Sequence, residues 1–105
     1  MKRIRLITTP RAQRDIDEHA LFIAGKNVDA GLRFLDAIDH ARSELARHPK
    51  IGAPRRFDSP ALSGFRVWPV PRFDRWLIFY LVDGDTVTIV RVLHSARDIP
   101  SILKD

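Results

Sequence analysis

One histidine, His94, stands where the sequence predicts that a strand gives way to a turn. The β-branched run at residues 86–93 favours extended structure, and residues 95–98 add serine and aspartate side chains that bond nearby backbone groups. Histidine titrates near neutral pH without help from its surroundings, so His94 is a candidate general base or acid. The alternative is a structural turn that is braced by His94, Arg97 and Asp98.

A ribonuclease built around His94 needs further groups. Cleavage of RNA through its 2′-hydroxyl requires a base for that hydroxyl, an acid for the leaving 5′-oxygen, and cations for the charge that develops on the phosphate. The cations available for such a site are Arg66, Arg75 and Arg91. Arg91 and His94 are three positions apart, which places them on opposite faces of a regular strand. They can act together only if the strand bends before His94.

Arginine and aromatic residues are interleaved in the second half of the chain. Five arginines lie between residues 55 and 75 against two aspartates, and seven of the nine aromatic residues lie between residues 57 and 80. This mixture is typical of a surface that binds single-stranded nucleic acid by stacking and phosphate contacts. The alternative is a buried central strand with solvated arginines at its ends. At the strand ends we expect a partner-binding surface formed by Arg66, Trp68, Arg72 and Arg75.

The chain is basic, with a formal net charge of +5 and a pI of about 10.4. Fourteen of its 18 cations are arginine, whose guanidinium group can bond a carboxylate or a phosphate through two N–H groups at once. A basic balance favours acidic partners: nucleic acid, the acidic tail of another protein, or an enzyme that handles nucleic acid. The alternative reading of the charge alone is a solubilising surface.

Composition also excludes several classes of site. The absence of cysteine rules out disulfides and thiolate metal sites. His19, His40 and His48 have no second ligand at metal spacing, so we expect no metal site and no cofactor. No apolar run reaches the roughly 18 residues that cross a bilayer, and the apolar part of the chain start is too short for a signal peptide. We therefore expect one cytoplasmic domain over residues 1–105 with no membrane partner.

The order of the predicted elements indicates an α+β fold. An alternating pattern predicts a strand at residues 2–8, and Thr9-Pro10 is typical of a helix N-cap followed by its first residue. Two amphipathic helices with a short link predict an antiparallel αα-hairpin, and residues 49–64 predict a loop. Strands are expected at residues 65–70, 75–82 and 86–93, with a short C-terminal helix capped by Asp98. The hairpin is expected to pack on one face of an antiparallel sheet, in the order β-α-α-β-β-β.

Over nearly its full length the chain resembles the RelE/ParE toxin superfamily, and the ParE side more than the RelE side. The segments that carry the resemblance are Thr9-Pro10-Arg11-Ala12-x-x-Asp15-Ile16, Ala30 with Phe34, His48-Pro49-x-Ile51-Gly52, Trp76-Leu77-Ile78-Phe79-Tyr80, and residues 91–98. Each segment is weak alone, and together, in this order, they are fairly specific. The fold of that superfamily agrees with the α+β order derived above.

The resemblance implies a toxin that an antitoxin encoded beside it holds inactive in a hetero-oligomer. ParE-type toxins poison DNA gyrase, whereas RelE-type toxins cut messenger RNA on the ribosome with clustered lysines and arginines and a late tyrosine or histidine. No lysine lies between Lys50 and Lys104 in this chain, and the single tyrosine, Tyr80, falls inside an apolar run. The resemblance therefore favours a gyrase inhibitor that acts by binding. The alternatives are a ribosome-dependent mRNA interferase with His94 as general base and a non-toxic binding module.

The resemblance also indicates how the antitoxin binds. Such antitoxins bind operator DNA through one half and lay an acidic, helical tail over the toxin. We expect a ParD-like antitoxin to occupy the apolar groove beside the αα-hairpin and to contact Arg66, Arg72 and Arg75 with acidic groups. Operator DNA is then reached only through the antitoxin.

Overall fold

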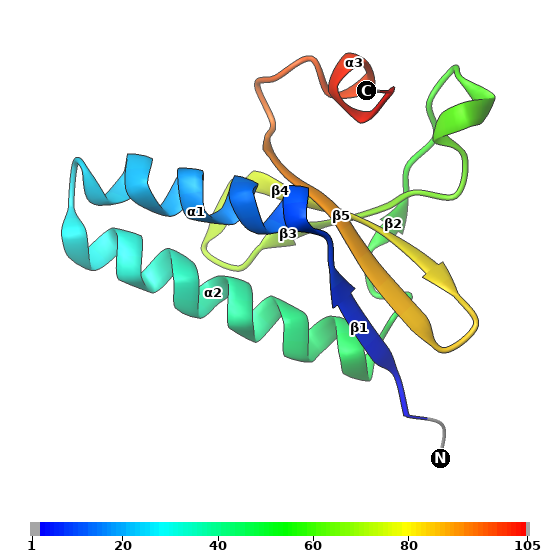
Figure 1. The fold of residues 1–105 in the computed structure, drawn as a ribbon, viewed down its shortest axis with the longest axis horizontal. Coiled ribbons are helices and arrows are strands. Elements are labelled where there is room, and N and C mark those ends of the chain that lie inside the picture. The colour runs from blue at the N-terminus through cyan, green and yellow to red at the C-terminus, as the bar shows by residue number, and fades with distance from the viewer. Residues whose placement is uncertain (1–2, 105) are drawn as a thin grey trace.

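The computed structural model describes residues 3–104, and its elements follow the predicted order (Figure 1). The elements are β1 (Arg5–Thr8), α1 (Pro10–Ala24), α2 (Val28–Arg47), β2 (Ala53–Pro54), the 3-10 helix η1 (Pro60–Leu62), β3 (Arg66–Val70), β4 (Phe73–Asp83), β5 (Thr86–His94) and α3 (Ile99–Lys104). The α+β class expected from the sequence is confirmed. No helix within the described part of the chain is long and apolar enough to cross a membrane.

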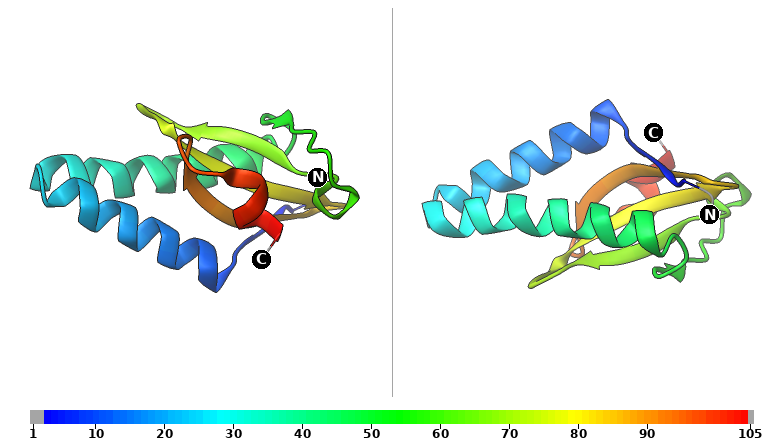
Figure 2. Two further views of the ribbon diagram at one scale, coloured as in Figure 1. Left: turned by 90° about the horizontal axis from the view of Figure 1, so that it is seen from above. Right: turned by 90° about the horizontal axis from the view of Figure 1, so that it is seen from below.

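Helices α1 and α2 form the predicted antiparallel pair, and the turn between them projects beyond the sheet (Figures 1 and 2). Each helix begins at a capping side chain: Thr9 accepts the N–H of Ala12, and Asn27 accepts the N–H of Ala30. These bonds satisfy backbone donors that a helix leaves free in its first turn. The apolar stripes of the two helices are buried, and their members are Ala12, Ile16, Ala20 and Ile23 in α1 and Phe34, Ile38, Ala41 and Leu45 in α2.

The five strands form one sheet in the order β1-β5-β4-β3-β2. Strands β2 to β5 are antiparallel to their neighbours, but β1 pairs with β5 in parallel, with Arg5 opposite Thr86 and Thr8 opposite Ile89. The sheet is therefore mixed, where an antiparallel sheet was expected. The short connections among β3, β4 and β5 build the antiparallel part and leave one edge of β5 free. Parallel pairing needs a long connection between the strands, and the helices and strands between β1 and β5 supply it.

Strand β4 is the central strand and is covered on both faces, as its apolar run predicted. Ile78 and Tyr80 belong to the core beneath α1 and α2. Phe79 belongs to a second cluster on the opposite face, together with Leu62 from η1 and Ile99 from α3. The sheet is thus the middle layer between the αα-hairpin and a thinner cover made by the C-terminal helix and the loop before β3.

The segment at residues 49–64, expected to be all loop, contains β2 and η1, so that expectation was wrong. Strand β2 pairs with β3 through Ala53 opposite Val67. The reason is tertiary: the Gly52 N–H donates to Tyr80 Oη at 2.8 Å, and Arg66 Nη1 donates to Gly52 O at 2.6 Å. These bonds hold the chain against β3. They involve residues far away in the sequence, so the proline and glycine residues of the segment itself could not indicate them.

The contact between Gly52 and Tyr80 leaves no room for a side chain. A Cβ atom at residue 52 would lie 2.6 Å from Tyr80 Oη and 2.7 Å from Val67 O. We expect Gly52→Ala to lower the free energy of unfolding by about 1–3 kcal/mol, measured by urea denaturation, because the core must shift to accept the methyl group. Gly25→Ala is the matched control, since its nearest atom lies 3.4 Å away. Equal stability of the two variants would contradict the close approach.

Candidate functional site

A buried carboxylate, Asp15, joins α1 to β5. Asp15 is 4% exposed, and its Oδ2 and Oδ1 atoms accept hydrogen bonds from Arg91 Nε at 2.7 Å and Arg91 Nη2 at 3.0 Å. Oδ2 also accepts the backbone N–H of Val92 at 3.1 Å. A two-point guanidinium contact and a backbone donor together satisfy a carboxylate that would otherwise be costly to bury. Arg91, a candidate catalytic cation, is therefore occupied by this pair.

Thr9, the N-cap of α1, and His19 within α1 bind the edge of β5 where β1 no longer covers it. The pairing of β1 ends opposite Ile89. Beyond that point Thr9 Oγ1 donates to Val90 O at 3.0 Å, and His19 Nε2 lies 2.7 Å from Val92 O, which places the hydrogen of that bond on Nε2. Exposed strand edges carry unpaired backbone groups that can recruit other strands. Here polar side chains of a helix satisfy them.

Strand β5 bends at a β-bulge, but the bend does not bring Arg91 and His94 together. Phe79 lies opposite Arg91, whereas Tyr80 lies opposite Ile89, so the residue between them on β5 has no partner on β4. From Arg91 to His94 the pairing is regular again. The two side chains therefore keep opposite faces of the strand. Arg91 meets Asp15, and His94 packs edge-on against Trp76 with ring centroids 4.9 Å apart.

The turn after β5 is bonded to His94. His94 Nδ1 accepts the N–H of Ala96 at 3.1 Å, and His94 O accepts the N–H of Arg97 at 3.0 Å. Because Nδ1 supplies its lone pair to Ala96, the neutral ring carries its hydrogen on Nε2, which can then donate but not accept. At the start of α3, Asp98 Oδ2 accepts from Ser101 Oγ at 2.8 Å, and the side chain of Arg97 is exposed.

Tyr80 and Arg66 form a second polar contact in the interior. The Tyr80 side chain is fully buried, and burial raises the pKa of its phenol, while the Gly52 N–H and the Arg66 charge act in the opposite direction. The phenol therefore stays neutral and out of reach of a substrate. Arg66 Nη1 donates to Gly52 O at 2.6 Å and to Lys50 O at 3.3 Å, so this arginine holds the chain before β2.

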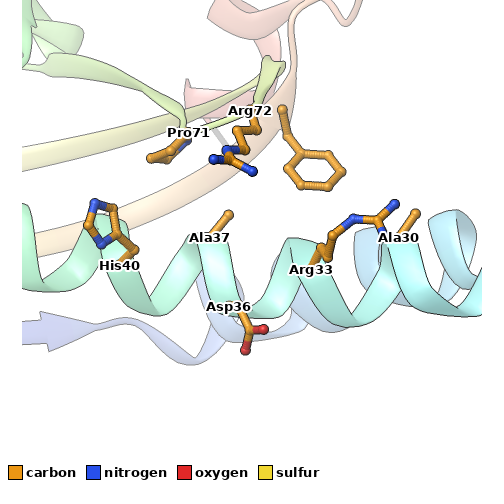
Figure 3. Close-up of a pocket in the computed structure, with 8 residues that line it drawn as sticks. Ala30, Arg33, Asp36, Ala37, His40, Pro71 and Arg72 are labelled. Atoms are coloured by element: carbon orange, nitrogen blue, oxygen red, sulfur yellow. The ribbon is translucent and has the colours of Figure 1, made fainter.

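A cavity of about 590 Å³ lies between α2 and the β3–β4 turn (Figure 3). Its apolar lining consists of Ala30, Ala37, Pro71 and Phe73, and its polar lining of Arg33, Asp36, His40 and Arg72. The guanidinium of Arg72 extends from the turn toward Ala37 on the helix, whereas the Asp36 carboxylate points away from the turn (Figure 3). This is a groove beside the αα-hairpin with cations at its rim and an apolar floor.

The structure does not gather the predicted partner-binding residues into one surface. Arg66 begins β3 opposite Tyr80, whereas Arg72 lies in the turn beyond Val70, the last residue of β3, and the length of β3 alone separates them by about 13 Å at the rise of a strand. Arg75 is exposed on β4, and Trp68 is partly buried in the core beneath the helices. Of these four residues, Arg72 alone lines the cavity beside α2.

Sequence reasoning missed the helix side of this cavity. Arg33 and His40 are exposed on α2 and line the cavity together with Ala30 and Ala37. Their seven-residue spacing places them on one helix face, which is the signal that could have found them. Within residues 3–104 no three histidine, aspartate or glutamate side chains gather as possible metal ligands.

Three comparisons place the chain among toxin sequences and structures. Residues 6–99 match the family described as the ParE toxin of the type II toxin–antitoxin system parDE. A Sinorhizobium fredii protein named as a toxin, Y4kP, is 31% identical over 98% of this chain and 100% of its own length. A chain of the chromosomal ParDE system from P. aeruginosa superposes with a TM-score of 0.68 at 21% identity, covering 87% of this chain and 95% of that one. A chain of the RelBE2 toxin–antitoxin complex from Mycobacterium tuberculosis gives a TM-score of 0.55 at 25% identity, with 89% and 99% covered.

The pairing of Asp15 with Arg91 makes a sharp prediction for stability. Arg91→Met leaves the buried Asp15 carboxylate with Arg11 as its remaining cation, 3.9 Å away and 52% exposed, and we expect a loss of about 3–5 kcal/mol in the free energy of unfolding by urea. Asp15→Asn in the same chain removes the stranded charge while keeping an acceptor for Val92 N–H, so the double variant should be more stable than Arg91→Met. Arg42→Met, in a pair whose Asp39 side chain is 73% exposed, is the control and should cost below about 1 kcal/mol. Similar losses for the Arg91 and Arg42 variants would contradict the assignment.

Proposed function

The chain belongs to the ParE toxin family of type II toxin–antitoxin systems, and we propose on that basis that it inhibits DNA gyrase by binding it in the cytoplasm. The match to the family over residues 6–99 is the observation that carries the proposal. The proposed cycle needs no bound cofactor. Growth stops when the toxin is free and resumes when a ParD-like antitoxin occupies it in a hetero-oligomer.

The contacts of the candidate catalytic groups support binding rather than RNA cleavage. Arg91 is paired with a buried carboxylate, and Arg66 donates to two backbone carbonyl groups. Tyr80 is fully buried. His94 accepts a backbone N–H at Nδ1, so its outer nitrogen carries a hydrogen and cannot take the proton of a 2′-hydroxyl. A ribonuclease would have to release several of these structural bonds before it could act.

The groove beside α2 supports the proposed antitoxin site. Its rim holds Arg33 and Arg72 with His40 nearby, and its floor is formed by alanine, proline and phenylalanine side chains. An acidic residue next to an apolar side chain on the antitoxin tail fits this arrangement, because the carboxylate meets a guanidinium while the apolar group leaves water. Operator DNA takes part only through the antitoxin in this proposal.

A supercoiling assay tests the target. The purified chain should inhibit the ATP-dependent supercoiling of relaxed plasmid by gyrase, and His94→Gln should leave that inhibition unchanged, since the proposed mechanism uses no proton transfer. The same preparations, added to a coupled translation reaction, should leave messenger RNA intact.

Two results would replace the proposal. Messenger RNA cleavage that needs the ribosome and is lost in His94→Gln identifies an mRNA interferase with His94 in the chemistry. Expression without the antitoxin, with no effect on either growth or gyrase, identifies a non-toxic binding module.

A charge reversal in the groove tests the antitoxin site. Arg72→Glu should weaken binding of the antitoxin, the product of the adjacent reading frame, by about 2 kcal/mol or more in isothermal titration calorimetry, because a like charge then faces the acidic tail. Arg14→Glu makes the same change at an exposed position of α1 and serves as control. Equal affinities of the two variants would remove the antitoxin from this groove, while leaving the gyrase result untouched.

A further inference from the structure

The ion pairs seen among residues 3–104 lie in α1, α2 and β5. Within residues 3–104 they are Arg11 and Arg91 with Asp15, His40 and Arg47 with Glu44, and Arg42 with Asp39. The segment from residue 50 to residue 75 contains six cations and two carboxylates. None of these six cations has a carboxylate within ion-pair distance in the described part of the chain. Their charge is therefore not neutralised by these carboxylates and can attract an outside anion, although Arg66 Nη1 already donates to two backbone carbonyl groups.

Part of this charge surrounds a groove of about 450 Å³ at the β2 edge of the sheet. Arg55, Arg56 and Arg66 line it together with Ser63, and no carboxylate is among its lining residues. The groove shares no residue with the cavity beside α2. It is a separate site from the groove proposed for the antitoxin.

Two of the three arginines of this groove make contacts that restrict their side chains. Arg66 donates to the carbonyl groups of Gly52 and Lys50. The Arg55 guanidinium lies over the Phe57 ring, 5.5 Å from its centroid, and the Arg55 N–H donates to Phe65 O at 2.8 Å. An arginine that is already ordered loses less side-chain entropy when it binds an anion. Arg55 and Arg66 are thus restricted in the fold, whereas Arg56 is exposed beside them.

We propose that this groove binds the phosphodiester backbone of a nucleic acid without reading its sequence. Guanidinium groups bond phosphate oxygens in pairs, and a nucleic acid presents phosphates at a density that can engage several neighbouring cations at once. Phe57 is covered by Arg55 and is not offered for base stacking. The contacts therefore go to the backbone, which positions a protein on nucleic acid but specifies no bases. An acidic peptide is the competing ligand, and the experiment separates the two.

Fluorescence anisotropy with a short labelled DNA duplex of random sequence, and with the matching RNA duplex, measures the binding. Arg55→Gln/Arg56→Gln should weaken binding of the duplex by about tenfold or more and should make the slope of log K against log salt less steep by about two, because two phosphate contacts are lost. Arg5→Gln/Arg14→Gln removes the same charge at two exposed positions of β1 and α1 and is the matched control. If the double variant unfolds, Arg56→Gln alone replaces it, because this variant keeps the Arg55–Phe57 contact. The slope should then become less steep by about one.

Each outcome has one meaning. Loss of affinity confined to the groove variants supports the site. Equal losses in both double variants show a general effect of net charge and overturn it. Binding of polyglutamate at the groove, with no binding of either duplex, overturns it in favour of an acidic peptide. The measurement contains neither gyrase nor antitoxin, so failure here is distinguishable from failure of the proposed function.

Discussion

The buried carboxylate of Asp15 requires hydrogen-bond donors, and the position of α1 on the sheet follows from where those donors lie. A carboxylate that is 4% exposed is tolerated only if hydrogen-bond donors surround it, and removal of one partner is far more costly than the pair is worth in itself. Arg91 and the backbone of Val92 supply those donors from β5. These bonds fix the position of α1 relative to β5. Helix α2 packs against α1, so its position on the sheet is fixed as well. The position of the groove beside α2 depends on this chain of contacts.

The parts of the fold that could be predicted are those with local causes. Apolar spacing and capping residues predicted α1 and α2, and the apolar run of β4 predicted a central strand. These predictions were possible because hydrophobic periodicity depends on residues that are close together in the sequence. The sequence gives no local sign that Asp15 is buried, since a carboxylate beside an apolar stripe is ordinary on a solvated helix and its partner, Arg91, is 76 positions away. Strand β2 was missed for the same reason, because Tyr80 holds it across the sheet.

The site was predicted less well than the fold. Sequence spacing correctly separated Arg91 from His94, but it placed Arg66 and Arg72 on one surface when each lines a different cavity. Distances across a sheet depend on register and on turns, and a bulge or an irregular turn alters both. A groove beside the αα-hairpin was expected, but Arg33 on its helix side was not among the predicted partner-binding residues. Side chains from two layers form this groove, so no single segment could reveal it.

The pairing of β1 with β5 has a consequence for synthesis. In the described part of the chain, β1 pairs with β5, which is the last strand. Side-chain hydrogen bonds of Thr9, Asp15 and His19 reach residues 90–92 on the same strand. Contacts between such distant positions form late and slowly, because a long loop must close first. During synthesis on the ribosome, α1 and α2 emerge before β5, the strand that α1 contacts, has been translated. The fold is thus incomplete until β5 has been translated, because β1 and α1 lack their partners on the sheet before then.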